Sequence, residues 1–134
     1  MIVKLSREQA NQMIEEALKR HPIEACGGIF GRMEGEIARV ERVVPLRNIL
    51  ESEIMFQIDP EEFLRVLLDL EGEGLTHLGF FHSHPGNARP SMLDLKYMRL
   101  WPESIWIIVS SVNYEFAAYQ ITDGNLREVY ISIE

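Results

Sequence analysis

The sequence has only one cysteine, Cys26, among its 134 residues. An intramolecular disulfide is therefore excluded, and so are zinc sites built from two or four cysteines. No apolar run approaches the length of a membrane-spanning helix, and the first residues lack the basic start and apolar middle of a secretory signal peptide. We therefore expect a cytoplasmic protein without a membrane partner, in which Cys26 is a small buried apolar side chain.

Positive charge is also scarce in this chain. The 13 Lys and Arg residues face 21 Asp and Glu residues, which gives a formal net charge of −8. Because nucleic acids bind proteins mainly through their phosphates, we expect no nucleic-acid partner. Hydrophobic residues make up 46% and charged residues 25% of the chain, as in globular domains. There are no repeats, linkers or low-complexity segments, so we expect one domain spanning residues 1–134.

Three helices are expected. Ser6 and Gln9 form a capping box ahead of an apolar stripe with helical spacing, which predicts a helix that ends at His21. Asp59, followed by proline, is typical of a second helix start. This second helix is apolar nearly all round, so we expect it to be well buried. A third helix is expected over Ser91–Leu100.

Strands are expected before, between and after these helices. Their predicted ranges are Met1–Leu5 (a strand or an arm), Ile23–Gly31, Ile37–Val44, Ile54–Ile58, Thr76–His84, Ile105–Ser110, Tyr114–Ile121 and Leu126–Ile133. The uninterrupted apolar run at Ile105–Ser110 is typical of a strand covered on both faces. Pro45–Glu53 is expected to be a loop. The pattern as a whole predicts an α/β fold with a mixed sheet.

Two histidines end the predicted strand Thr76–His84. Because His82 and His84 are two residues apart, a strand would place both imidazoles on one face and Ser83 on the other. Two rings side by side on a stiff element can supply two ligands of a metal site. The alternative is an ordinary histidine pair without a metal. His77, at the start of the strand, is expected to be structural or exposed.

A third metal ligand is expected at Asp94. The Pro- and Gly-rich turn Pro85–Pro90 follows the strand, and Ser91 begins a helix three residues before Asp94. That helix would aim the Asp94 carboxylate toward its own N-terminus, near the end of the strand. Two histidines and a carboxylate leave one tetrahedral position for water, the pattern of a catalytic zinc site. The alternative is that Ser91 and Asp94 form only a capping box.

This pattern resembles the JAMM (MPN+) zinc metalloprotease family, in its prokaryotic single-domain form. The family signature is a distant Glu, then His-Ser/Thr-His-Pro, a short spacer and Ser-x-x-Asp. The matching residues are Glu24, His82, Ser83, His84, Pro85, Ser91 and Asp94. The segment Pro22-x-Glu24-x-Cys26-Gly27 and the order of predicted elements extend the resemblance over most of the chain. The spacer, Pro85–Pro90, is one residue shorter than is usual in the family.

The resemblance implies an α/β/α sandwich related to the cytidine deaminases, although the Pro-Cys-x-x-Cys element that deaminases need is absent. It implies one zinc ion on His82, His84 and Asp94, with Glu24 as general base and Ser91 as hydrogen-bond donor to the oxyanion. Without the resemblance, a loop position in water is an equal alternative for Glu24. The implied activity is that of a deubiquitinase-like isopeptidase, whose partner is a ubiquitin-like modifier or sulfur-carrier protein.

Two other functions stay open at this point. A non-catalytic MPN-type scaffold would lack the ligands that this chain keeps, and a zinc amidohydrolase acting on a small molecule would differ only in its groove. The tail of a modifier is expected to pair with a free sheet edge beside Pro85–Pro90, with Pro45–Ile58 as the second wall of the groove. The oligomeric state stays open, with a homodimer as one alternative, and so does the identity of the modifier.

Overall fold

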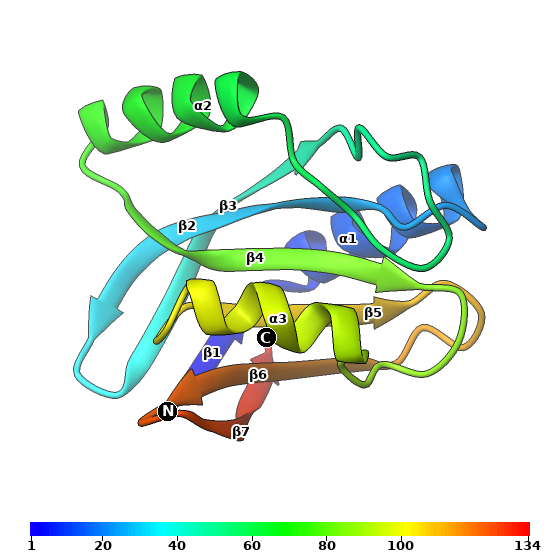
Figure 1. Cartoon of the computed structure of the whole chain (residues 1–134). Helices are drawn as coiled ribbons and strands as arrows, with labels where there is room; N and C mark the ends of the chain where they lie inside the picture. Colours follow the sequence, from blue (N-terminus) through cyan, green and yellow to red (C-terminus); the bar gives the residue numbers. More distant parts are fainter.

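A computed structural model describes residues 1–134, which form one mixed sheet and three helices (Figure 1). The strands are β1 (Ile2–Leu5), β2 (Cys26–Glu34), β3 (Ile37–Leu46), β4 (Thr76–His84), β5 (Ile105–Ser110), β6 (Phe116–Thr122) and β7 (Asn125–Ile133). The helices are α1 (Arg7–Arg20), α2 (Pro60–Gly72) and α3 (Met92–Leu100). The predicted α/β class with a mixed sheet is confirmed.

The sheet closes on itself. Its strands follow the order β1-β3-β2-β4-β5-β6-β7, and the short strand β1 pairs in parallel with both β3 and β7. The central strand β4 lies between antiparallel β2 and parallel β5. In Figure 1, α1 lies behind the sheet and α3 crosses in front of it, with α2 near the top. Because both sides of β4 are paired, the expected free sheet edge beside Pro85–Pro90 is wrong.

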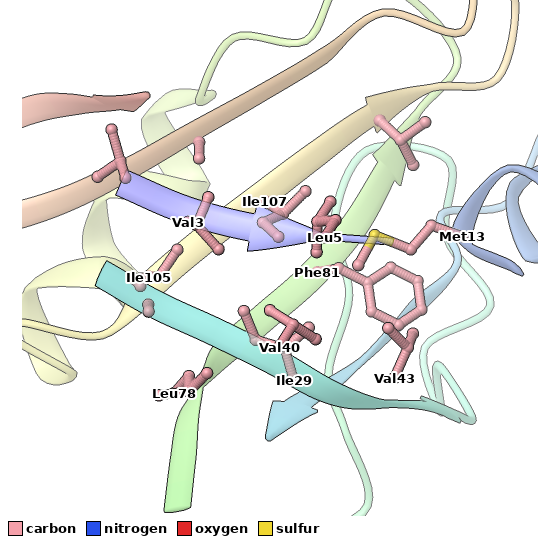
Figure 2. Close-up of a cluster of buried hydrophobic side chains, with 14 of the residues drawn as sticks. Val3, Leu5, Met13, Ile29, Val40, Val43, Leu78, Phe81, Ile105 and Ile107 are labelled. Carbon is pink, nitrogen blue, oxygen red and sulfur yellow. The ribbon is translucent and has the colours of Figure 1, made fainter. Parts of the chain in front are cut away.

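The main core lies between the sheet and α1. Ser6 caps this helix as predicted, since its Oγ accepts the Gln9 N–H at 3.0 Å and its own N–H donates to Gln9 Oε1 at 2.9 Å. Met13, on the apolar stripe of α1, packs in a core to which all seven strands contribute buried side chains, among them Phe81 and Ile107 (Figure 2). This packing fixes the rear face of β4.

A second core lies on the other face of the sheet, under α3. It contains Phe80, Trp106 and Met98, together with Cys26. Cys26 is 1% exposed, and burial raises the pKa of its thiol to about 12. The prediction that Cys26 is a small buried apolar side chain is confirmed.

A β-bulge in β4 decides which side chains face each core. The register between β2 and β4 shifts so that Leu78 has no partner on β2. The adjacent Gly79 lies so close to β5 that a Cβ atom there would collide with the backbone oxygen of Ile105. After the bulge, Phe81 faces the core under α1 and Phe80 faces the core under α3. The same alternation then reaches the two histidines.

Two predicted strands differ in the structure. β2 begins at Cys26 rather than Ile23, so Glu24 precedes the strand. Residues 54–58 form no strand, and their only ladder contact is an isolated bridge between Asn48 and Ile58. Phe56 and Ile58 of this segment instead turn their side chains into the second core, where Phe56 is 7% exposed, while Ile54 faces solvent.

The prediction that α2 is well buried is wrong. Only Leu70 of this helix is buried, whereas Leu64 and Leu68 are 54% and 61% exposed. The reason is that α2 covers a small core around Phe30 with one face and has no neighbour on the other. None of the three helices combines the length and the apolar composition needed to span a membrane.

Candidate metal centre

His82 and His84 end β4 on the same face of the sheet. Their Nε2 atoms lie 3.1 Å apart, and the rings are 0% and 8% exposed. Ser83 faces the other way, and its Oγ accepts the N–H of Ala25 at 2.8 Å. The predicted placement of the two imidazoles on one face is therefore confirmed. Pairing with neighbours on both sides holds this part of β4, since His82 is opposite Cys26 on β2.

Asp94 reaches these rings from the first turn of α3. Its N–H donates to Ser91 Oγ at 3.0 Å, and its Oδ2 accepts the Ser91 N–H at 2.8 Å, so the capping box is present. The same Oδ2 lies 3.1 Å from His82 Nε2 and 3.0 Å from His84 Nε2. The capping box is therefore confirmed, and it aims the Asp94 carboxylate at the two histidines, as the predicted metal site requires.

The short spacer Pro85–Pro90 does not prevent this approach. His84 Nδ1 lies 3.1 Å from the backbone oxygen of Asn87, and Asn87 Oδ1 accepts the Arg89 N–H at 3.0 Å. These contacts fold the spacer against the end of β4. Ser91 consequently begins α3 next to the histidine pair, despite the missing residue.

Glu24 joins this cluster from the segment that precedes β2. The side chain is 2% exposed, and its Oε2 lies 3.7 Å from His84 Nε2. One ligand atom each from Glu24, His82, His84 and Asp94 lies within 4.8 Å of the other three. The alternative that Glu24 is a loop residue in water is therefore wrong.

The cluster fits a small divalent cation. The three donor atoms of His82, His84 and Asp94 are separated by 3.0–3.1 Å. Tetrahedral zinc with ligand bonds near 2.0–2.1 Å separates its ligand atoms by about 3.3 Å, close to these values. Glu24 Oε1 is buried without a hydrogen-bond partner, as expected of a carboxylate that faces a reacting group. The donors present thus suit a metal ion, with Glu24 beside it.

Burial and mutual contact shift the pKa values of the four groups. For Asp94, burial alone would raise the pKa, but the two histidines and the Ser91 N–H hold it well below its usual range. Burial lowers the pKa of His82, whereas at His84 the two carboxylates outweigh burial and raise it. An ionised carboxylate and a neutral imidazole are the forms that bind metals.

Glu24 has the largest upward shift of the cluster. Burial raises its pKa from 4.5 to about 8, with the negative charge of Asp94 adding to burial and His84 opposing it. A bound cation would lower this pKa again by stabilising the carboxylate. In the absence of a cation, burial thus favours the protonated form of the Glu24 carboxyl near neutral pH.

An apolar pocket of about 210 Å³ opens beside the cluster of Glu24, His82, His84 and Asp94. Phe56 lies between the pocket and the cluster, since its ring lines the pocket and stacks on His82 with ring centroids 4.7 Å apart. The pocket is lined by Phe56, Gln57, Ile58, Pro60, Phe63, Phe80, Tyr97, Trp101 and Trp106. His77 packs on Phe63 and Phe80 behind it, away from the cluster, which confirms that His77 is structural.

Two residues near the site carry no recognisable signal in the sequence. Phe56 was placed on a strand, although it belongs to the loop that follows β3. Asn48 received no role, yet it is buried and donates from Nδ2 to the backbone oxygen of Glu24 at 3.1 Å. Neither position shows a periodic pattern, because both are defined by contacts between distant segments.

The chain is similar to known proteins over most of its length. The family described as prokaryotic homologs of the JAB domain matches residues 6–122. A Pyrococcus furiosus protein named desampylase is 40% identical over 114 residues, which cover 84% of this chain and 77% of that protein. The CysO-cysteine peptidase of Mycobacterium tuberculosis is 28% identical over 136 aligned residues, covering 98% of this chain and 91% of that protein. The solution structure of a Desulfitobacterium hafniense protein matches with a TM-score of 0.86 and 34% identity, covering 100% of this chain and 93% of that one.

Proposed function

Because the chain belongs to the prokaryotic homologs of the JAB domain, we propose that it is a zinc-dependent metallopeptidase of the JAMM type. Its substrate would be a peptide or isopeptide bond at the C-terminus of a ubiquitin-like modifier or sulfur-carrier protein, in the cytoplasm. The observation that carries this proposal is the convergence of Glu24, His82, His84 and Asp94 in one buried cluster. The relatives named desampylase and CysO-cysteine peptidase support the substrate class.

His82, His84 and Asp94 would hold the zinc ion. Bound there, zinc would supply Lewis acidity and lower the pKa of a water molecule toward about 7. Glu24 Oε2, 3.7 Å from His84 Nε2, lies where it can take a proton from the attacking water and pass it to the leaving amine. Its role is therefore that of general base and then general acid.

Ser91 would stabilise the oxyanion. Its Oγ accepts the N–H of Asp94, so the hydroxyl hydrogen itself remains available to donate. A substrate carbonyl placed between the histidine pair and the start of α3 would be within reach of this hydroxyl. Removing such a donor typically costs about 2.7–4 kcal/mol of transition-state stabilisation.

The modifier tail would lie between the loop that follows β3 and the helix α3. Phe56 and Ile58 of this loop line the apolar pocket beside the metal cluster, and Tyr97 of α3 lines its other side. Since β4 has no free edge, backbone pairing with the tail would have to use the loop. Such a narrow groove favours small residues at the scissile end.

The test is a cleavage series on ubiquitin-like fusions with Gly, Ala, Leu or Pro at the scissile end. We expect cleavage with Gly, strong loss with Leu because its side chain collides with the groove, and loss with Pro because it removes a backbone donor. Equal rates across the series would contradict strand-like docking and favour an amidohydrolase acting on small molecules. A zinc-loaded protein that cleaves none of the fusions would favour the scaffold.

A further inference from the structure

Asn48 is a buried amide outside the metal cluster, at the start of the loop formed by residues 47–59. It is 6% exposed. Its Nδ2 donates to the backbone oxygens of Glu24 and Met55, both at 3.1 Å. Its Oδ1 accepts the N–H groups of Leu50 and Gln57, also at 3.1 Å. The side chain therefore uses both its donors and both its acceptors.

Glu24 depends on the same loop for its own backbone hydrogen bonds. Its N–H donates to the backbone oxygen of Ser52 at 2.9 Å, and its carbonyl accepts from Asn48. The next residue, Ala25, is instead hydrogen-bonded to Ser83 on β4. Its carbonyl accepts the Ser83 N–H at 2.9 Å, and its own N–H donates to Ser83 Oγ at 2.8 Å. Glu24 thus lies between a strand that is paired on both sides and a loop with a single β-bridge.

The loop that holds Glu24 also borders the proposed groove. Phe56 stacks on His82, while Ile54 is 69% exposed. A tail lying in the groove would therefore contact the loop. We propose that Asn48 is a positioning residue that couples the observed conformation of the 47–59 loop to the catalytic position of Glu24. This inference deepens, and rests on, the proposed function of Glu24 as general base.

The physical basis is the cost of unpaired buried groups. Removal of the Asn48 amide leaves the buried carbonyl of Glu24 without this donor and frees two N–H groups of the loop. The loop then opens more readily, and the Ser52 contact to the Glu24 N–H is lost with it. A displacement of about 1 Å at a catalytic group can lower the rate by about 10²-fold.

Hydrogen exchange of the wild-type protein tests the coupling without any activity. The Glu24 N–H and the loop N–H of Ile49, which donates to the backbone oxygen of Gln57 at 3.0 Å, should exchange through the same opening, with equal opening free energies below that of Ile29 in the β2 core. In N48A both should exchange faster by the same factor. Asn113 is the matched control, since its Oδ1 accepts only the Glu115 N–H in an exposed turn, and in N113A both rates should be unchanged. Exchange of the Glu24 N–H together with that of Ile29, while the Ile49 N–H exchanges faster, would overturn the inference.

Kinetics test the consequence for the base. We expect N48A to lower kcat by about 10²-fold with unchanged metal content, and the loss to disappear when Asn48→Ala is combined with Glu24→Gln. A raised KM with unchanged kcat, or an equal loss on the Glu24→Gln background, would show that Asn48 only shapes the groove. If the wild type cleaves no fusion, the proposed function fails, and the exchange measurement still decides whether the loop and Glu24 open together. If N48A does not fold, the wild-type exchange pattern alone decides it.

Discussion

The candidate site has two halves, the proposed metal-binding half and the half that carries the proposed base, and the two are held in different ways. His82, His84 and Asp94 come from one continuous strand-turn-helix segment, fixed by pairing of β4 on both sides and by the cap of α3. Glu24 lies far away in the sequence, before β2, and depends on contacts with the 47–59 loop. Metal binding should therefore survive changes that remove the base, whereas loss of the metal ligands should abolish both.

The largest effect is expected from removing both histidines. The double variant His82→Ala with His84→Ala should bind no zinc and show no detectable cleavage, because one carboxylate cannot hold the ion alone. Metal analysis of the purified protein checks this, with the wild type expected to carry about one zinc per chain. Stoichiometric zinc retained by the double variant would contradict the ligand assignment.

Removal of the base should separate the two halves. Glu24→Gln should lower kcat by about 10²–10⁴-fold with zinc still bound, since general acid–base catalysis contributes this much and the base is not a ligand. The matched control is Glu53→Gln, which changes an exposed carboxylate on the loop and should keep full activity. If Glu24→Gln loses its zinc, Glu24 is a ligand and the division into two halves fails.

Ser91 is both the N-cap of α3 and the proposed hydrogen-bond donor to the oxyanion. Ser91→Ala should cost about 1 kcal/mol of stability as a lost N-cap. It should also lower kcat by about 10²–10³-fold as a lost oxyanion donor. Thermal unfolding and steady-state kinetics measure the two effects separately. A stability loss with unchanged kcat would leave Ser91 with its structural role alone.

The smallest expected effect is on the pH dependence of stability in the metal-free protein. Glu24, with its pKa raised from 4.5 to about 8, keeps a proton that the unfolded chain has lost. The folded state therefore binds more protons over this window, and stability falls as the pH rises through it. Glu24→Gln should remove part of this fall in unfolding experiments at pH 5 to 8 with a chelator. Parallel curves for the two proteins would contradict the buried environment of Glu24.

Much of the metal-binding half could be predicted from the sequence because its determinants are local. The spacing of His82 and His84 on an apolar strand, and of Ser91 and Asp94 at a helix start, involves neighbours in the chain. The place of Glu24 in the site could be predicted only from the family resemblance. Its burial depends on a loop more than twenty residues away, and no local pattern encodes such a contact.

The errors have a similar cause. The apolar and β-type residues of Ile54–Ile58 predicted a strand, but Phe56 and Ile58 pack into the second core and line the pocket beside His82, where packing outweighs strand propensity. The apolar residues of α2 predicted burial on all sides, yet Leu64 and Leu68 face outward. The composition of a helix shows which of its faces are apolar, but it does not show whether another element covers them.

Cleavage of a ubiquitin-like fusion by one preparation of the protein, before and after removal of its metal, tests the central claim most directly. The protein is treated with a chelator, dialysed and then reconstituted with zinc, and the products are identified by mass spectrometry. We predict cleavage after the last residue of the modifier only in the zinc-loaded protein, with about one zinc bound per chain. Equal cleavage by the metal-free protein, or no cleavage with one zinc bound, would contradict the account.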